Sequence, residues 1–106
     1  MNWQVEYEEA AKADLKKLDA TQQMLVLKGI RKVSQNPLPQ SEGGYGKPLG
    51  NHSDTRLAGL MKIKFRDAGL RVVYRVIRTE TTMKIIVISV RDDEAVYKLA
   101  AKRMGR

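Results

Sequence analysis

The sequence predicts a single α+β domain, residues 1–106, with the element order β-α-α-β-β-β-α and a small, mainly antiparallel four-stranded sheet. Three observations lead to this prediction. The chain has 106 residues, a length that suits one domain. Its hydrophobic content of 42% is enough for one modest core. Apolar residues recur at helical spacing between residues 8 and 35, and they alternate with polar residues between residues 60 and 91.

The N-terminal third of the chain predicts one strand followed by a helical hairpin. Residues 2–7 alternate between apolar and polar side chains, which is typical of a half-buried strand. From Glu8 the apolar period becomes helical, and either Asp19 or Thr21 can cap a second helix that ends before Pro37. The apolar stripes are Ala11, Leu15 and Leu18 in the first helix, and Val26, Ile30 and Val33 in the second.

The rest of the chain predicts three strands and a last helix. Residues 37–58 hold all three prolines and show no periodicity, so we expect them to lack regular structure. Residues 60–65, 70–77 and 84–90 have strand character and are joined by short turns. From Asp92 the pattern is helical, with acidic residues first and basic residues last, as the helix dipole favours.

Composition excludes several kinds of site. The chain has no cysteine, which excludes a disulfide scaffold, a thiol nucleophile and a thiolate metal site. A single histidine, His52, excludes a multi-histidine site, and we interpret it as a surface residue. The longest apolar run, Ile85 to Ile88, is too short for a signal peptide or a membrane span. We therefore expect a cytoplasmic protein that does not bind a membrane.

Positive charge is concentrated in the second half of the chain. Residues 45–106 carry fourteen basic and six acidic residues, which accounts for the whole net charge of +8. Strand alternation should place the basic residues of the sheet on one face and the apolar residues, with Ile86 and Ile88 together, on the other. The two N-terminal helices should cover the apolar face and leave the basic face open. The basic residues expected there are Lys62, Lys64, Arg66, Arg71, Arg75 and Arg91.

This basic face predicts a binding site for phosphate groups of RNA or DNA. Like charges on neighbouring strands repel, and a bound anion would offset that cost. The alternative is that long basic side chains simply solvate the exposed side of the sheet. The face lacks the clustered carboxylates of a metal-dependent nuclease, so RNA cleavage here would use no metal or cofactor. It would require attack by the 2′-hydroxyl, a base, a cationic clamp and an acid. Tyr97 could stack on a nucleobase or pack against the sheet.

Residues 62–66, Lys-Ile-Lys-Phe-Arg, and residues 69–76, Gly-Leu-Arg-Val-Val-Tyr-Arg-Val, resemble the central strands of the RelE/ParE toxin superfamily, and specifically its RelE-type members. The segment from Ile88 to Tyr97 also fits, and the resemblance covers nearly the whole chain in the expected order. It implies a RelE-like fold and the toxin of a type II toxin–antitoxin pair. Such toxins enter the ribosomal A site and cleave the mRNA codon there without metal, leaving a 2′,3′-cyclic phosphate.

The resemblance also implies roles and partners. The roles are Lys62 and Lys64 as the base and charge-stabilising pair, Arg71 as phosphate clamp, Arg91 as proton donor or second clamp, and Tyr97 as the stacking residue. We expect Arg66 and Arg75 to assist RNA binding. The implied partners are a neutralising antitoxin, the ribosome and mRNA, with operator DNA reached only through the antitoxin complex.

Two other functions remain open at this point. A ParE-like inhibitor of DNA gyrase would share the fold without cleaving RNA. ParE-like proteins generally lack the paired lysines and the terminal tyrosine, so Lys62, Lys64 and Tyr97 argue against that function. A nucleic-acid-binding module without catalysis would need only the basic face.

Overall fold

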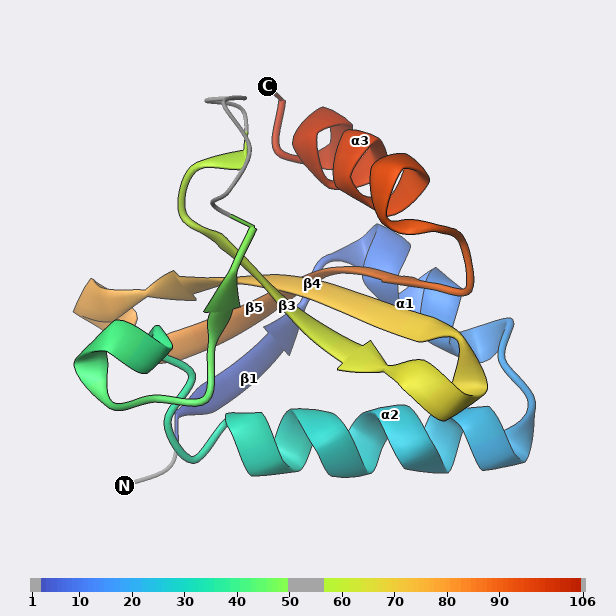
Figure 1. Cartoon of the computed structure of the whole chain (residues 1–106), viewed down its shortest axis with the longest axis horizontal. Coiled ribbons are helices and arrows are strands. Elements are labelled where there is room, and N and C mark those ends of the chain that lie inside the picture. Colours follow the sequence, from blue (N-terminus) through green and yellow to red (C-terminus); the bar gives the residue numbers. More distant parts are fainter. Residues whose placement is uncertain (1–2, 50–56, 106) are drawn as a thin grey trace.

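The structure is a computed structural model that describes residues 3–49 and 57–105 (Figure 1). His52 lies outside the described residues. The strands are β1 (Gln4–Tyr7), β2 (Lys47–Pro48), β3 (Leu60–Phe65), β4 (Leu70–Ile77) and β5 (Thr82–Ser89), and the helices are α1 (Glu9–Lys16), α2 (Ala20–Val33) and α3 (Asp93–Arg103). No helix among the described residues is long and apolar enough to cross a membrane.

The strands form one sheet in the order β1-β5-β4-β3-β2. Strands β3, β4 and β5 are antiparallel neighbours, and β1 pairs with β5 in parallel at one edge. The predicted α+β class is confirmed, but the strand number was wrong by one. Strand β2, inside the segment expected to be irregular, pairs antiparallel with β3. Its Pro48 lacks a backbone N–H, which an edge strand tolerates.

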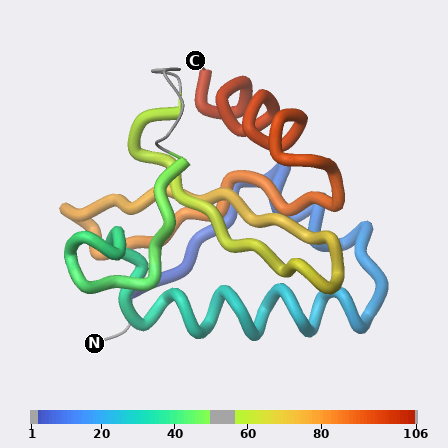
Figure 2. Tube along the Cα trace, viewed as in Figure 1, coloured from blue at the N-terminus to red at the C-terminus, as the bar shows by residue number. Residues whose placement is uncertain are grey.

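The helical hairpin packs against one face of the sheet, as predicted. Figures 1 and 2 show α2 running along this face. Asp19 caps α2 in a capping box, since its side chain accepts from the backbone N–H of Gln22 at 2.8 Å while the Gln22 side chain accepts from the Asp19 N–H. The buried cluster on this face consists of Ala11, Val26, Ile30, Val33, Met61, Leu70, Val72, Tyr74, Met83, Ile85 and Ile88.

The opposite face is not open, which corrects our expectation. Helix α3 lies over it, on the other side of the sheet from α2 (Figure 2). A second buried cluster forms there from Leu49, Leu57, Leu60, Val73, Ile86, Val87, Val96, Tyr97, Ala100 and Ala101. This face therefore carries an apolar core of its own under α3.

A bulge in β5 explains how this second core arises. Val73 pairs with Val87, but the next residue of β4, Tyr74, pairs with Ile85. Ile86 is thus an extra residue that interrupts the alternation of faces. Ile86 joins the cluster under α3, whereas Ile88 joins the cluster under α1 and α2. Our expectation that Ile86 and Ile88 share a face was wrong because it assumed a regular strand.

Helix α3 is capped at its first turn and fixed to the rest of the fold near its last turn. The Asp92 side chain caps it by accepting from the Ala95 N–H at 2.9 Å. Near the other end, Arg103 donates to Asp14 of α1 at 2.7 Å and to the Ile86 carbonyl at 2.8 Å. The last contact uses the backbone at the bulge. The cap stabilises the first turn of α3, and the Arg103 contacts fix its last turn to α1 and to β5.

Candidate active site

Two neighbouring strands place basic side chains beside each other under the start of α3. Lys64 of β3 lies opposite Arg71 of β4, and Arg71 lies opposite Ser89 of β5. Alternation turns the adjacent Ile63 and Phe65 to the helical-hairpin core. The prediction that Lys62 and Lys64 share the face away from the hairpin is therefore confirmed.

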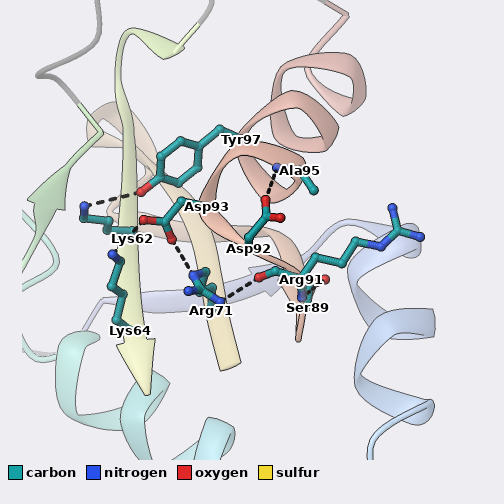
Figure 3. A network of polar contacts seen from close by, with 9 residues as sticks. All are labelled: Lys62, Lys64, Arg71, Ser89, Arg91, Asp92, Asp93, Ala95 and Tyr97. Atoms are coloured by element: carbon teal, nitrogen blue, oxygen red, sulfur yellow. Dashed lines mark hydrogen bonds and ion pairs between the residues drawn. The ribbon is translucent and has the colours of Figure 1, made fainter. Parts of the chain in front are cut away.

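The carboxylate of Asp93 links Lys64 and Arg71 (Figure 3). Lys64 Nζ donates to Asp93 Oδ2 at 2.8 Å, and Arg71 Nε donates to Asp93 Oδ1. Arg71 also donates through Nη1 to the carbonyl oxygen of Arg91 at 2.6 Å. Two cations from adjacent strands thus converge on one anionic group from the first residue of α3.

Tyr97 reaches the same face one helical turn further along α3. Its hydroxyl accepts a hydrogen bond from Lys62 Nζ at 3.3 Å, and that nitrogen lies 5.9 Å from the centroid of the ring. The residue is only 6% exposed and belongs to the cluster under α3. Tyr97 therefore packs against the sheet while its hydroxyl holds a lysine of the basic face.

The electrostatics of the site follow from these contacts. The hydrogen bond from Lys64, followed by that from Arg71, lowers the pKa of Asp93 below its usual value against an opposing effect of burial. Asp93 is consequently ionised near neutral pH. Burial, with a further contribution from the Asp93 charge, raises the pKa of Tyr97. The Tyr97 phenol therefore keeps its proton.

The other predicted site residues lie around this cluster. Arg66 follows β3 in a one-turn 3-10 helix, and it lines a shallow pocket of about 240 Å³ together with Lys64 and Arg71. Arg75 lies further along β4, opposite Leu60, and its buried Nε has no hydrogen-bond partner among the described residues. The structure does not join Arg75 to the contacts around Asp93.

Arg91 contributes its backbone to the cluster but not its side chain. Its carbonyl oxygen accepts from Arg71, and its N–H donates to Ser89 Oγ at 3.1 Å. The guanidinium points away from Lys64 and Arg71, as Figure 3 shows. It lines a separate groove that is also lined by Lys17, the residue that follows α1.

Sequence reasoning assigned Asp93 only to the helix dipole and missed its place in the site. A usable signal was present, because Asp93 precedes Tyr97 by four residues and residues at this spacing share one face of a helix. If Tyr97 faces the basic strands, Asp93 must face them too. The resulting arrangement is chemically a two-cation site for an oxyanion, bordered by a lysine and a phenol.

Comparisons with known proteins show the family to which this chain belongs. The family model described as ParE toxin of the type II toxin–antitoxin system matches residues 5–97. A curated Escherichia coli protein described as RelE-like toxin protein is 31% identical over 104 residues, covering 98% of this chain and 99% of that protein.

Solved structures show the same fold. A mutant E. coli RelE toxin in the free state superposes with a TM-score of 0.73 at 24% identity, covering 98% of this chain and 99% of that one. The RelBE2 toxin–antitoxin complex of Mycobacterium tuberculosis gives a TM-score of 0.68 at 26% identity, with 88% and 95% of the chains covered. The chain therefore belongs to the RelE/ParE superfamily and is a RelE-type toxin of the type II toxin–antitoxin class.

Proposed function

We propose that this toxin is a metal-free, ribosome-dependent endoribonuclease that cleaves mRNA codons in the A site and so inhibits translation. The observation that carries the proposal is the convergence of Lys64 and Arg71 on one carboxylate. Donors that hold a carboxylate from two sides are equally suited to the non-bridging oxygens of a phosphodiester. Lys62 and Tyr97 border this position.

In the proposed reaction the RNA supplies its own nucleophile. A base removes the proton of the 2′-hydroxyl, the O2′–P bond forms, and the P–O5′ bond breaks to leave a 2′,3′-cyclic phosphate. Lys62 is the better placed base, because it has no carboxylate partner among the described residues whereas Lys64 is ion-paired. Lys64 and Arg71 stabilise the charge that develops on the phosphate.

The remaining residues complete the proposed site. The departing 5′-oxygen must receive a proton, and Arg91 is the proposed donor or second clamp once its side chain turns toward Arg71. Tyr97 orients Lys62 and the substrate. Arg66 and Arg75 extend the positive surface along the RNA.

We further propose that an antitoxin neutralises this toxin. Several structural neighbours are complexes of RelE with RelB, from E. coli and from Pyrococcus horikoshii. The net charge of +8 suits an acidic segment of such a partner. Contact with operator DNA would then occur only through the antitoxin complex.

The test uses translating ribosomes with a defined A-site codon in the presence of EDTA. We expect a cut within that codon that bears a cyclic-phosphate end. Lys64→Ala should slow the cut by about a hundredfold or more, the scale for removing one preorganised charge-stabilising group. Lys16→Ala, on the exposed side of α1, is the matched control and should cleave normally.

The match to the ParE family model favours a second candidate, inhibition of DNA gyrase without RNA cleavage. The same preparation is therefore assayed for gyrase supercoiling. Wild-type protein that leaves A-site mRNA intact while it inhibits supercoiling would overturn the ribonuclease proposal in favour of this one.

A further inference from the structure

Three cations of the candidate site, Lys62, Lys64 and Arg71, all contact a single short segment of the chain, residues 91–97. Lys62 contacts Tyr97, Lys64 contacts Asp93, and Arg71 contacts Asp93 and the Arg91 carbonyl. The segment therefore covers the position at which a substrate phosphate would have to bind. A substrate can reach the basic pair only if one of these contacts is exchanged.

Asp93 occupies the anion position in the way a phosphate would. Its two carboxylate oxygens are used separately, Oδ2 by Lys64 Nζ and Oδ1 by Arg71 Nε. A phosphodiester likewise offers two charged, non-bridging oxygens to such donors. Two anions cannot share one pair of cations without strong repulsion. RNA and Asp93 must compete for Lys64 and Arg71.

The packing of α3 indicates which part of residues 91–97 can move aside for a substrate. Val96, Ala100 and Ala101 of the helix are buried in the sheet, and Arg103 is ion-paired to Asp14 at 2.7 Å. The Asp93 side chain, by contrast, is 38% exposed. As the first residue of α3, it can turn to solvent and still profit from the positive end of the helix dipole. Exchange needs a side-chain rotation and leaves the helix in place.

We propose that Asp93 is a built-in competitor for the phosphate-binding pair Lys64 and Arg71, and that RNA binds by displacing its carboxylate. The proposal rests on the proposed function in taking RNA as the ligand. The contrary role is that Asp93 positions the two cations for substrate. The two roles predict opposite changes in RNA affinity when the Asp93 carboxylate is removed. Removing a competitor strengthens RNA binding, whereas removing a positioning residue weakens it.

The experiment measures RNA binding by the full chain, with cleavage made impossible. The probe is a short single-stranded RNA that carries 2′-deoxyribose at the scissile position, titrated at low salt by fluorescence anisotropy. Asp93→Asn keeps the shape of the side chain and removes its charge. Glu94→Gln is the matched control, because it removes the same charge from the next residue, whose ion pair is with the exposed Lys98.

For Asp93→Asn we expect about tenfold tighter binding of the probe, and for Glu94→Gln a change of less than about twofold, the range of a screened surface charge. In a Lys64→Ala background the gain from Asp93→Asn should shrink, because the competition acts through that lysine. Equal or weaker binding by Asp93→Asn than by Glu94→Gln would overturn the proposal. Asp93→Ser replaces it if the asparagine variant is not folded by circular dichroism.

A second readout separates this proposal from the ribonuclease proposal. Inorganic pyrophosphate is titrated into wild-type protein, Asp93→Asn and Glu94→Gln, and the backbone NMR signals of residues 64, 71 and 93 are followed. If the ribosome assay shows no cleavage but pyrophosphate and RNA bind the Asp93→Asn variant more tightly than wild type, Asp93 is a competitor for the anion site and the ribonuclease proposal is wrong. If cleavage occurs and both ligands bind the Asp93→Asn variant no better than wild type, the ribonuclease proposal is supported and the proposal that Asp93 competes with RNA is wrong.

Discussion

The two faces of the sheet are built from the same strands but differ in what their side chains do. The face under α1 and α2 is covered by an apolar cluster that includes Val72, Tyr74 and Ile85. The face under α3 is apolar near Val73 and Val87 but carries Lys64 and Arg71 at the end beneath the first turn of the helix. Both faces therefore contribute buried apolar residues to stability, whereas the candidate chemistry is confined to one end of one face.

The largest expected effect is loss of stability on the hairpin face. Ile85 is fully buried, and Ile85→Ala should lower the free energy of unfolding by about 2–5 kcal/mol, the usual cost of such a cavity. Urea denaturation followed by Trp3 fluorescence measures it. Val90→Ala, at a position 58% exposed, should stay within about 0.5 kcal/mol. A loss below about 1 kcal/mol for Ile85→Ala would show that the face under α1 and α2 does not hold a tightly packed core.

The next effect should be larger in activity than in stability. Arg71→Lys keeps the charge but loses the planar fork that contacts both Asp93 and the Arg91 carbonyl. We expect A-site cleavage to fall by about tenfold or more, as for loss of a preorganised donor. The free energy of unfolding, measured in urea, should fall by only about 0.5–1.5 kcal/mol, the net contribution of one hydrogen bond. Arg78→Lys, in an exposed turn with an ion pair to Glu42, is the control and should cleave normally.

A smaller loss of stability is expected at Tyr97, whose ring lies in the apolar cluster and whose hydroxyl contacts a lysine of the basic face. Tyr97→Phe keeps the buried ring and removes the hydroxyl that accepts from Lys62. The free energy of unfolding should fall by about 0.5–1.5 kcal/mol, the net contribution of one hydrogen bond. Tyr45→Phe is the control, because Tyr45 is exposed and its ring also lies near a lysine, Lys32, at 5.6 Å. A loss as large as that of Ile85→Ala would mean that the hydroxyl belongs to the core.

The smallest effect concerns acid pH. The pKa of Asp93 is lower in the folded protein than in the unfolded chain, so its ion pairs stabilise the fold above the unfolded pKa, about 4. This contribution is lost as the pH falls through the lower, folded pKa. Asp93→Asn should therefore have a lower free energy of unfolding than wild type at pH 7. This difference between the two proteins should disappear toward about pH 2. Urea denaturation of both proteins across that pH range measures the difference in free energy of unfolding. A difference that does not change with pH would show that the ion pairs of Asp93 do not stabilise the fold.

Much of the fold follows from local patterns in the sequence. The change of apolar spacing from alternating to helical located both helices of the hairpin. Asp19, one of the two caps predicted for the second helix, caps it in the structure. Strand alternation correctly placed Lys62 and Lys64 opposite Ile63 and Phe65. These features depend on the spacing of neighbouring residues, which is what a sequence displays directly.

The features that sequence reasoning missed depend on contacts between distant segments. The bulge at Ile86 breaks an alternation that looks regular in the sequence. Strand β2 has two residues, too few to show any period. Two of the four buried residues of α3 are alanines, so the apolar stripe of this helix is weak. The contact of Asp93 with Lys64 and Arg71 joins residues that are more than twenty positions apart.

The parallel pairing of β1 with β5 also orders the events of folding. Gln4 pairs with Thr82 and Tyr7 with Ile85, so the first strand finds its only described neighbour in the sheet near the far end of the chain. During synthesis the helical hairpin can form early, but β1 must wait for β5. Pairing across so long a stretch is a slow, entropically costly step. The toxin should thus acquire its complete sheet, and with it the platform for the residues that follow β5, only after β5 itself has been synthesised.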